Sequence, residues 1–132
     1  MEVLLVDDQP TTVQVFAADV RKTFSGARVH TAVDLPEALQ IASARRLDLV
    51  LLDLALPSCD GIQAVVRFHG AFPDVPILVL SATEDGERIR ECIEAGANGY
   101  MPKTMAVTAL SDAMKLVANG GLYLPPRSSS AH

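Results

Sequence analysis

The chain has 132 residues, of which 49% are apolar and 20% are charged, and its formal net charge is −5 at pH 7. This composition excludes a disordered or low-complexity chain, and the length suffices for one folded domain without disulfides. No apolar run approaches the roughly 20 residues that a membrane span needs, and no secretory signal opens the sequence. Neither half of the chain is basic, so no nucleic-acid surface is predicted. We expect a soluble, cytoplasmic protein that does not bind membranes.

Short apolar runs alternate along the chain with segments whose apolar residues recur every three or four positions, which is typical of an α/β fold. Strands are predicted at 3–6, 28–32, 49–52, 77–80 and 99–101. A helix is predicted after each strand, around 10–24, 34–42, 62–69, 89–95 and 104–118. Five such units predict one doubly wound parallel sheet of flavodoxin-like strand order 2-1-3-4-5 with five helices.

Several helix boundaries carry their own signals. Asp34 and Glu37 form a capping-box pattern at the start of the second helix. Gly96 can end the fourth helix in a left-handed conformation, and the Asn-Gly-Gly run at 119–121 stops the fifth. No amphipathic element follows, so we expect the folded domain to cover 1–121 and residues 122–132 to be a linker stub or an added tail.

Polar side chains follow four of the five predicted strands, at the edge where a sheet of this kind binds ligands. Asp7 and Asp8 follow the first strand, Asp53 the third, Ser81 the fourth and Lys103 the fifth. Three neighbouring carboxylates repel one another unless a cation neutralises them, and Mg²⁺ suits two or three carboxylates together with a phosphate oxygen. The lysine then supplies a positive charge opposite the metal, where a dianionic group fits.

Most of these residues also have an ordinary structural explanation. Asp7 or Asp8 would cap the first helix and Ser81 the fourth, and Lys103 would be a solvated surface cation. Asp53, which closes an all-apolar strand, has no such explanation. The chain also lacks the glycine and serine motifs of nucleotide binding and acyl transfer. We therefore favour a metal-assisted site for a phosphorylated group.

Four motifs resemble the receiver domain of two-component response regulators, over essentially the whole chain to about residue 121. They are LLVDD at 4–8, LLDLALP at 51–57 with DG at 60–61, LVLSA at 78–82 and GANGYMPK at 96–103. The segments GYMPKT at 99–104 and NGGLYLPP at 119–126 look most like the NarL/LuxR-type subfamily. The resemblance implies a CheY-like fold and a receiver that precedes a helix-turn-helix output domain, which is not in this chain.

The resemblance implies that Asp53 accepts a phosphoryl group from a phosphohistidine on a sensor histidine kinase. Ser81 and Lys103 match the residues that bind the phosphoryl oxygens. A carboxylate is a competent nucleophile for this transfer, which depends mainly on positioning and charge neutralisation. Such a protein is not otherwise an enzyme, because it catalyses only its own phosphorylation and dephosphorylation.

The resemblance also implies a metal site and a switch. Mg²⁺ would be held by Asp7, Asp8, Asp53 and the backbone carbonyl of Ala55. Tyr100 matches the family's aromatic switch residue; we expect its ring to turn inward as the Ser81 hydroxyl moves toward the phosphoryl group, although it could simply be a boundary aromatic over the fifth strand. The expected output is a changed partner or homodimer contact that switches a transcription regulator, with DNA bound only through the output domain.

Two alternatives stay open. A stand-alone receiver would act as a phosphorelay intermediate or a protein-binding adaptor. A Mg²⁺-dependent phosphohydrolase of the haloacid dehalogenase type also uses a strand-end Asp nucleophile, but it needs a second acid two residues later, where this chain has Ala55.

Overall fold

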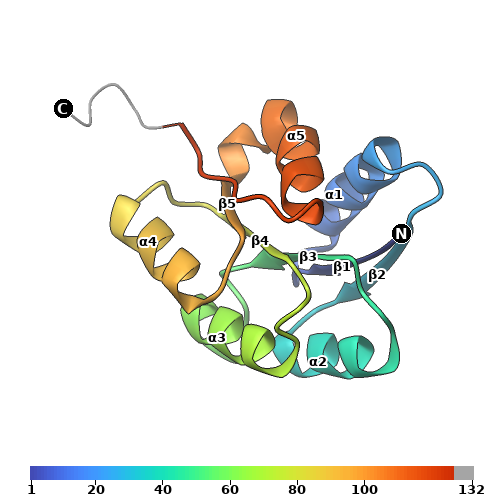
Figure 1. Ribbon diagram of the computed structural model, residues 1–132, viewed down its shortest axis with the longest axis horizontal. Coiled ribbons are helices and arrows are strands. Elements are labelled where there is room, and N and C mark those ends of the chain that lie inside the picture. Colours follow the sequence, from blue (N-terminus) through green and yellow to red (C-terminus); the bar gives the residue numbers. More distant parts are fainter. Residues whose placement is uncertain (127–132) are drawn as a thin grey trace.

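The computed structural model describes residues 1–126, apart from the side chain of Val107, and strands alternate with helices along it (Figure 1). The strands are β1 (Glu2–Val6), β2 (Arg28–Ala32), β3 (Leu49–Asp53), β4 (Ile77–Ser81) and β5 (Gly99–Pro102). The helices are α1 (Pro10–Thr23), α2 (Leu35–Ala44), α3 (Gly61–Ala71), α4 (Gly86–Ala95) and α5 (Ala106–Ala118). A short 3₁₀ turn, Lys103–Met105, joins β5 to α5, so the predicted helix start near Thr104 falls inside a tighter turn that precedes the α-helix.

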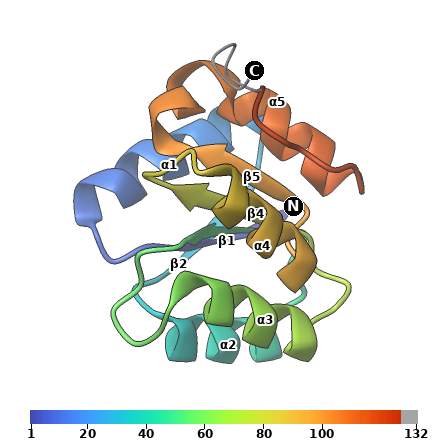
Figure 2. The same cartoon turned by 90° about the vertical axis from the view of Figure 1, so that its left-hand side faces the viewer.

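The five strands form one parallel sheet in the order β2-β1-β3-β4-β5, which confirms the predicted fold. Helices α2, α3 and α4 cover one face and α1 and α5 cover the other (Figures 1 and 2). Successive side chains of a strand point to opposite faces, so Leu4 and Val6 join the first apolar cluster while Val3 and Leu5 join the second. Every residue of β3 and β4 is buried, as expected for central strands covered on both faces.

The helix N-termini differ in part from the structural alternatives that the sequence allowed. The N-cap of α1 is Gln9, which makes no side-chain cap bond, and the N-cap of α4 is Asp85. Neither Asp7, Asp8 nor Ser81 therefore serves as a helix N-cap. At α2 the acids of the predicted capping box are both used, but Asp34 accepts from the Leu35 amide and Glu37 from the Val33 amide.

The predicted end of α4 is confirmed by the backbone of Gly96. Its φ is +122°, a conformation that favours glycine, and its amide bonds back to α4. A Cβ at this position would also lie 2.4 Å from Cγ of His69 on α3, so no larger side chain fits there.

The segment after α5 lies against the sheet, a contact that the sequence did not indicate. The Tyr123 amide donates to the Asn98 carbonyl at 3.0 Å, and the Tyr100 amide donates to the Tyr123 carbonyl at 3.1 Å. Tyr123 is half-buried, whereas Leu122 and Leu124 on either side of it are exposed. Residues 127–132 of the predicted tail lie outside the described residues, and the domain boundary at 121 stays a prediction.

Candidate functional site

Three carboxylates meet at the carboxyl edge of the sheet. Asp7 and Asp8 follow β1, Asp53 ends the adjacent strand β3, and one oxygen of each lies within 4.8 Å of the others. Asp7 and Asp53 are 1% and 2% exposed, while Asp8 faces solvent. The predicted acidic cluster therefore exists in the fold, with two of its three members shielded from water.

The two oxygens of Asp53 have different surroundings. Oδ1 accepts a hydrogen bond from the Ala55 amide at 3.1 Å, which fixes the carboxylate relative to the loop that follows β3. Oδ2 lies 3.3 Å from Nζ of Lys103. Lys103, predicted from its position after β5, thus reaches across β4 to the acidic cluster.

Lys103 also lies 3.6 Å from Oδ2 of Asp7, so one ammonium faces two buried carboxylates. With all three acids ionised and Lys103 protonated, the cluster keeps a net charge of −2. A divalent cation would neutralise this charge, and carboxylate oxygens are the ligands that Mg²⁺ prefers.

The side chain of Asp7 is buried, but one of its two carboxylate oxygens accepts no hydrogen bond. Its Oδ1 accepts from the Gln9 amide at 2.8 Å, but its buried Oδ2 has no hydrogen-bond partner. Burial raises the pKa of Asp7, and the nearby Asp53 charge raises it further, against the lowering effects of the Gln9 amide and Lys103. A buried carboxylate oxygen without a donor is costly, so this position fits a metal ligand.

Ser81 and Tyr100 hold the loop between β4 and α4 from two sides. The Oγ of Ser81 accepts from the Thr83 amide at 3.2 Å, and the Tyr100 hydroxyl donates to the Thr83 carbonyl at 2.7 Å. The Tyr100 ring is fully buried, and burial raises the pKa of its hydroxyl. Tyr100 is therefore a core residue and not a boundary aromatic, and its ring already lies inward without a phosphoryl group, so the inward turn that we expected on phosphorylation is not needed; its role as a switch stays a prediction.

Comparison with known proteins identifies the family. The family model described as the response regulator receiver domain matches residues 3–115. This chain belongs to the response regulator receiver domain family. This match confirms the family that the four motifs predicted.

The receiver domain resembles transcription regulators along most of its length. It is 30% identical to the glycerol metabolism activator of Pseudomonas putida, over 95% of this chain and 57% of the relative. It is 35% identical to the transcriptional regulatory protein PrrA of Mycobacterium tuberculosis, over 98% of this chain and 52% of the relative. The receiver thus spans about half the length of the curated relatives that it matches.

Solved structures agree with this family. A LuxR family DNA-binding response regulator from Silicibacter pomeroyi superposes with a TM-score of 0.83 at 32% identity, covering 95% of this receiver and 97% of that chain. The receiver domain of the sensor histidine kinase PA1611 from Pseudomonas aeruginosa, with a magnesium ion in its active-site cleft, gives a TM-score of 0.77 at 31% identity, covering 90% and 98%. The first of these structures confirms the predicted likeness to LuxR-type receivers.

Two tertiary contacts around the receiver's site were not predicted. The Ser58 hydroxyl donates to Oδ1 of Asp34 at 2.8 Å, and Nη2 of Arg88 donates to Oδ1 of Asp60 at 3.1 Å. Asp34 and Asp60 stood out in the sequence as a cap and as part of a motif, but nothing local indicated their partners.

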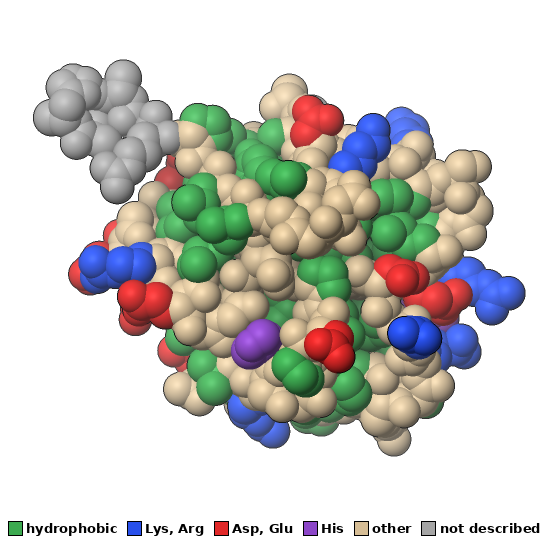
Figure 3. Space-filling view, in the orientation of Figure 1, with side chains coloured by type: hydrophobic (Ala, Val, Ile, Leu, Met, Phe, Trp, Pro, Cys, Tyr) green, Lys and Arg blue, Asp and Glu red, His purple; other side chains and the backbone are tan. Residues whose placement is uncertain are grey.

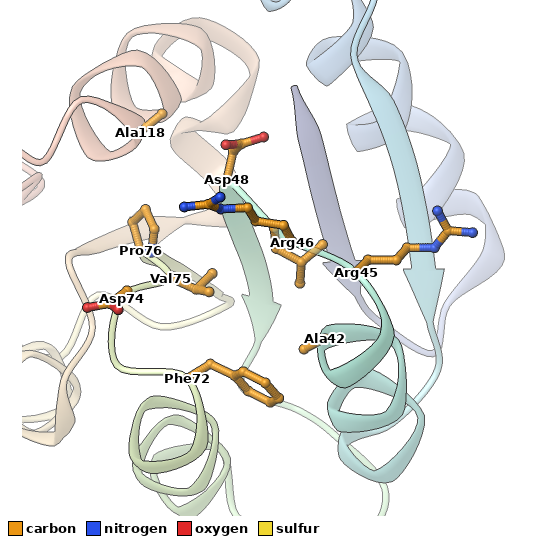
Figure 4. Close-up of a pocket in the computed structure, with 10 residues that line it drawn as sticks. Ala42, Arg45, Arg46, Asp48, Phe72, Asp74, Val75, Pro76 and Ala118 are labelled. Carbon is orange, nitrogen blue, oxygen red and sulfur yellow. The ribbon is translucent and has the colours of Figure 1, made fainter.

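A separate hollow of about 500 Å³ is lined by the residues that Figure 4 labels. Its lining includes Asp48 and Pro76, which precede β3 and β4, and therefore belongs to the amino edge of the sheet. Arg46 and Asp74 give the lining both signs of charge. This hollow is separate from the acidic cluster at the carboxyl edge.

On the face shown in Figure 3, acidic and basic side chains are interspersed. Among residues 1–126, no helix combines the length and the apolar character that crossing a membrane requires.

Proposed function

We propose that this receiver domain accepts a phosphoryl group on Asp53 and thereby switches a transcription regulator of which it is a part. The observation that carries the proposal is the pairing of a buried strand-end carboxylate with Lys103 at 3.3 Å, next to Asp7. This arrangement suits phosphoryl transfer, which depends mainly on positioning and charge neutralisation. The membership of the receiver family supports it.

The acidic cluster supports a site for Mg²⁺. Asp7, Asp8, Asp53 and the backbone carbonyl of Ala55 are the residues that would hold the ion, and the buried Oδ2 of Asp7, which accepts no hydrogen bond, fits this role. When bound, Mg²⁺ would supply positive charge for the phosphoryl oxygens. The magnesium ion in the PA1611 receiver is a fact about that relative and supports the same assignment here.

The proposed transfer begins with attack by an oxygen of Asp53 on the phosphorus of a phosphohistidine. The oxygen–phosphorus bond forms as the nitrogen–phosphorus bond breaks, and the donor imidazole leaves with the electron pair. Lys103, which already lies beside Oδ2 of Asp53, would then contact a phosphoryl oxygen. The Ser81 hydroxyl, at the end of the adjacent strand β4, would donate a hydrogen bond to another. We infer that the chain catalyses this transfer and the later hydrolysis of the aspartyl phosphate, in which water displaces the Asp53 carboxylate and inorganic phosphate is released, and no other reaction.

The proposed partners follow from the relatives. A sensor histidine kinase would supply the phosphoryl group, and a DNA-binding output domain beyond this receiver would receive the signal in the cytoplasm. Relatives named as transcriptional regulatory proteins, about twice as long as this chain, support the output domain. We also propose that phosphorylation promotes a homodimer.

Two alternative functions make different predictions. A stand-alone phosphorelay receiver or adaptor would have no output domain, so continuation of the reading frame into a basic helical domain would exclude it. A phosphohydrolase of the haloacid dehalogenase type needs a second acid two residues after the nucleophile, where Ala55 stands. We therefore expect no turnover of small phosphate esters.

The proposal is tested by intact-mass measurement after incubation with Mg²⁺ and a small acyl phosphate. The wild type should gain one base-labile phosphoryl group, and the gain should disappear with a chelator and in Asp53→Asn. Asp74→Asn, at an exposed acid near the amino edge, is the matched control and should be labelled like the wild type. Equal labelling of Asp53→Asn, or labelling without Mg²⁺, would refute the assignment.

A further inference from the structure

The loop between β3 and α3, residues 54–60, is held at both of its flanks. It begins next to Asp53 and contains Ala55, whose carbonyl is a proposed metal ligand. On one flank, the hydroxyl and amide of Ser58 donate to Oδ1 of Asp34, the N-cap of α2. On the other, Asp60 pairs with Arg88 of α4 at 3.1 Å.

The two ends of this loop are in direct contact. A Cβ placed on Gly61 would lie 2.5 Å from the Leu54 carbonyl oxygen, so the backbone at the end of the loop presses against its beginning. Asp60 precedes Gly61, and Leu54 precedes Ala55. A displacement at Asp60 is therefore transmitted through backbone contact to the residue beside the proposed metal ligand.

The Arg88–Asp60 pair has a specific electrostatic reason. Arg88 lies in the first turn of α4, where the positive end of the helix dipole disfavours a cation, so the guanidinium gains from reaching a carboxylate outside its own helix. Asp60 is the N-cap of α3 and also accepts from the Ile62 amide at 3.4 Å. Among the ion pairs of residues 1–126, this pair alone joins α4 to another element.

We propose that the Arg88–Asp60 pair couples the metal and phosphoryl site to the position of α4. This inference rests on the proposed function, and it names the contact through which a metal or phosphoryl group bound at the site affects the position of α4. Arg88 is a positioning residue, since it contacts Asp60 and not the acidic cluster. Coupling between two sites is reciprocal, so occupancy of the site orders α4, and loss of the pair weakens binding at the site.

The test combines Mg²⁺ titration by calorimetry with amide hydrogen exchange over residues 86–95, with and without Mg²⁺ and the phosphoryl mimic beryllofluoride. Arg88→Gln and Asp60→Asn break the pair from its two sides, and Arg88→Lys is the conservative variant. Arg90→Gln is the matched control, because Arg90 pairs with Glu87 inside α4 at 3.0 Å. Ser58→Ala removes the hydroxyl bond to Asp34, the shorter of the two contacts to α2, and leaves the Arg88–Asp60 pair in place.

In the wild type, ligands at the site should slow exchange in α4. Because exposed ion pairs are weak, Arg88→Gln and Asp60→Asn should lower Mg²⁺ affinity by only about two- to five-fold. Both should lose the slowing in α4, and Arg88→Lys should restore it. Ser58→Ala should weaken Mg²⁺ binding but keep the slowing, and Arg90→Gln should match the wild type in both measurements.

The outcomes separate this inference from the proposed function. A wild type that binds neither Mg²⁺ nor beryllofluoride overturns the proposed function and this coupling with it. A wild type that binds them without slowing in α4, or an Arg88→Gln variant that keeps the full slowing, overturns the coupling alone.

Discussion

Replacing Asp7 by Asn should stabilise the metal-free protein and abolish its stabilisation by Mg²⁺. Asp7 is buried beside Asp53, and its Oδ2 lacks a hydrogen-bond donor. Asn keeps the size of the side chain and the acceptor for the Gln9 amide, but it removes the charge. The substitution therefore isolates the cost of a buried carboxylate that a bound metal would otherwise stabilise.

The size of the effect follows from the distances around Asp7. With an effective dielectric constant of about 20, attraction to Lys103 at 3.6 Å is about 4–5 kcal/mol, and repulsion from Asp53 at up to 4.8 Å is about 3–4 kcal/mol. Asp8 adds further repulsion, so these terms nearly cancel and the desolvation of Asp7 remains. An unsatisfied buried acceptor costs about 1–3 kcal/mol, and about 1 kcal/mol recovered corresponds to a rise in Tm of roughly 3–6 °C for a domain of this size.

Thermal unfolding followed by circular dichroism, with and without Mg²⁺, measures this effect. The folded pKa of Asp7 lies above its unfolded value, so the folded state binds protons more tightly. The destabilisation by Asp7 is therefore full above its folded pKa and fades as pH falls toward its unfolded pKa, and the advantage of Asp7→Asn should shrink in the same direction. Asp74→Asn, at an exposed acid, is the control. A lower Tm for Asp7→Asn without Mg²⁺, or equal Mg²⁺ stabilisation of both proteins, would refute this reasoning.

Three further predictions use other side chains. In a titration, Lys103→Ala should bind Mg²⁺ as tightly as the wild type or more tightly, because the substitution removes a cation that competes with the metal. Intact-mass measurement should show slower uptake of the phosphoryl group. Weaker Mg²⁺ binding by Lys103→Ala would contradict this prediction. Tyr100→Phe removes the 2.7 Å hydrogen bond to the Thr83 carbonyl and should lower the free energy of unfolding, measured in urea, by about 1 kcal/mol. An unchanged free energy of unfolding would mean that this hydrogen bond does not stabilise the fold. Burial raises the pKa of Cys92 to about 11, so only about one Cys92 thiol in a thousand is ionised at pH 8. Iodoacetamide should therefore modify the half-buried Cys59 before Cys92. Equal rates of modification in the native state would show that α4 opens readily.

The sheet and the acidic cluster were predictable because parallel topology converts sequence order into spatial position. The apolar runs at 49–52 and 77–80 predicted two of the strands, and the structure buries β3 and β4 throughout. Once the strand order is known, the residues after adjacent strands must meet at one edge. Asp7 and Asp53 follow this rule across β1 and β3, and Lys103 follows it from β5.

Contacts that depend on loop conformation were not predictable in the same way. The Arg88–Asp60 pair joins a helix to a loop, and neither residue belongs to a periodic pattern that would indicate the other. The backbone bonds of Tyr123 to Asn98 and Tyr100 form an isolated bridge and not a full strand, so no alternation of apolar residues could indicate them. Even the capping box formed with different amide partners from those the pattern indicates, and the Asp34 carboxylate also accepts from Ser58.

The placement of these contacts has a common cause in the topology. In a parallel α/β sheet, the edge where strands end is also the edge where the following helices begin, so α2, α3 and α4 direct their positive N-terminal ends toward the acidic cluster. Their N-caps are all acids, Asp34, Asp60 and Asp85. A capping carboxylate has oxygen lone pairs beyond those its helix amides use, and two of these caps accept from Ser58 and Arg88 across neighbouring loops. The edge that gathers the three carboxylates thus also gathers the helix caps that join its loops, and the proposed coupling from Asp53 to α4 through the Arg88–Asp60 pair depends on this arrangement.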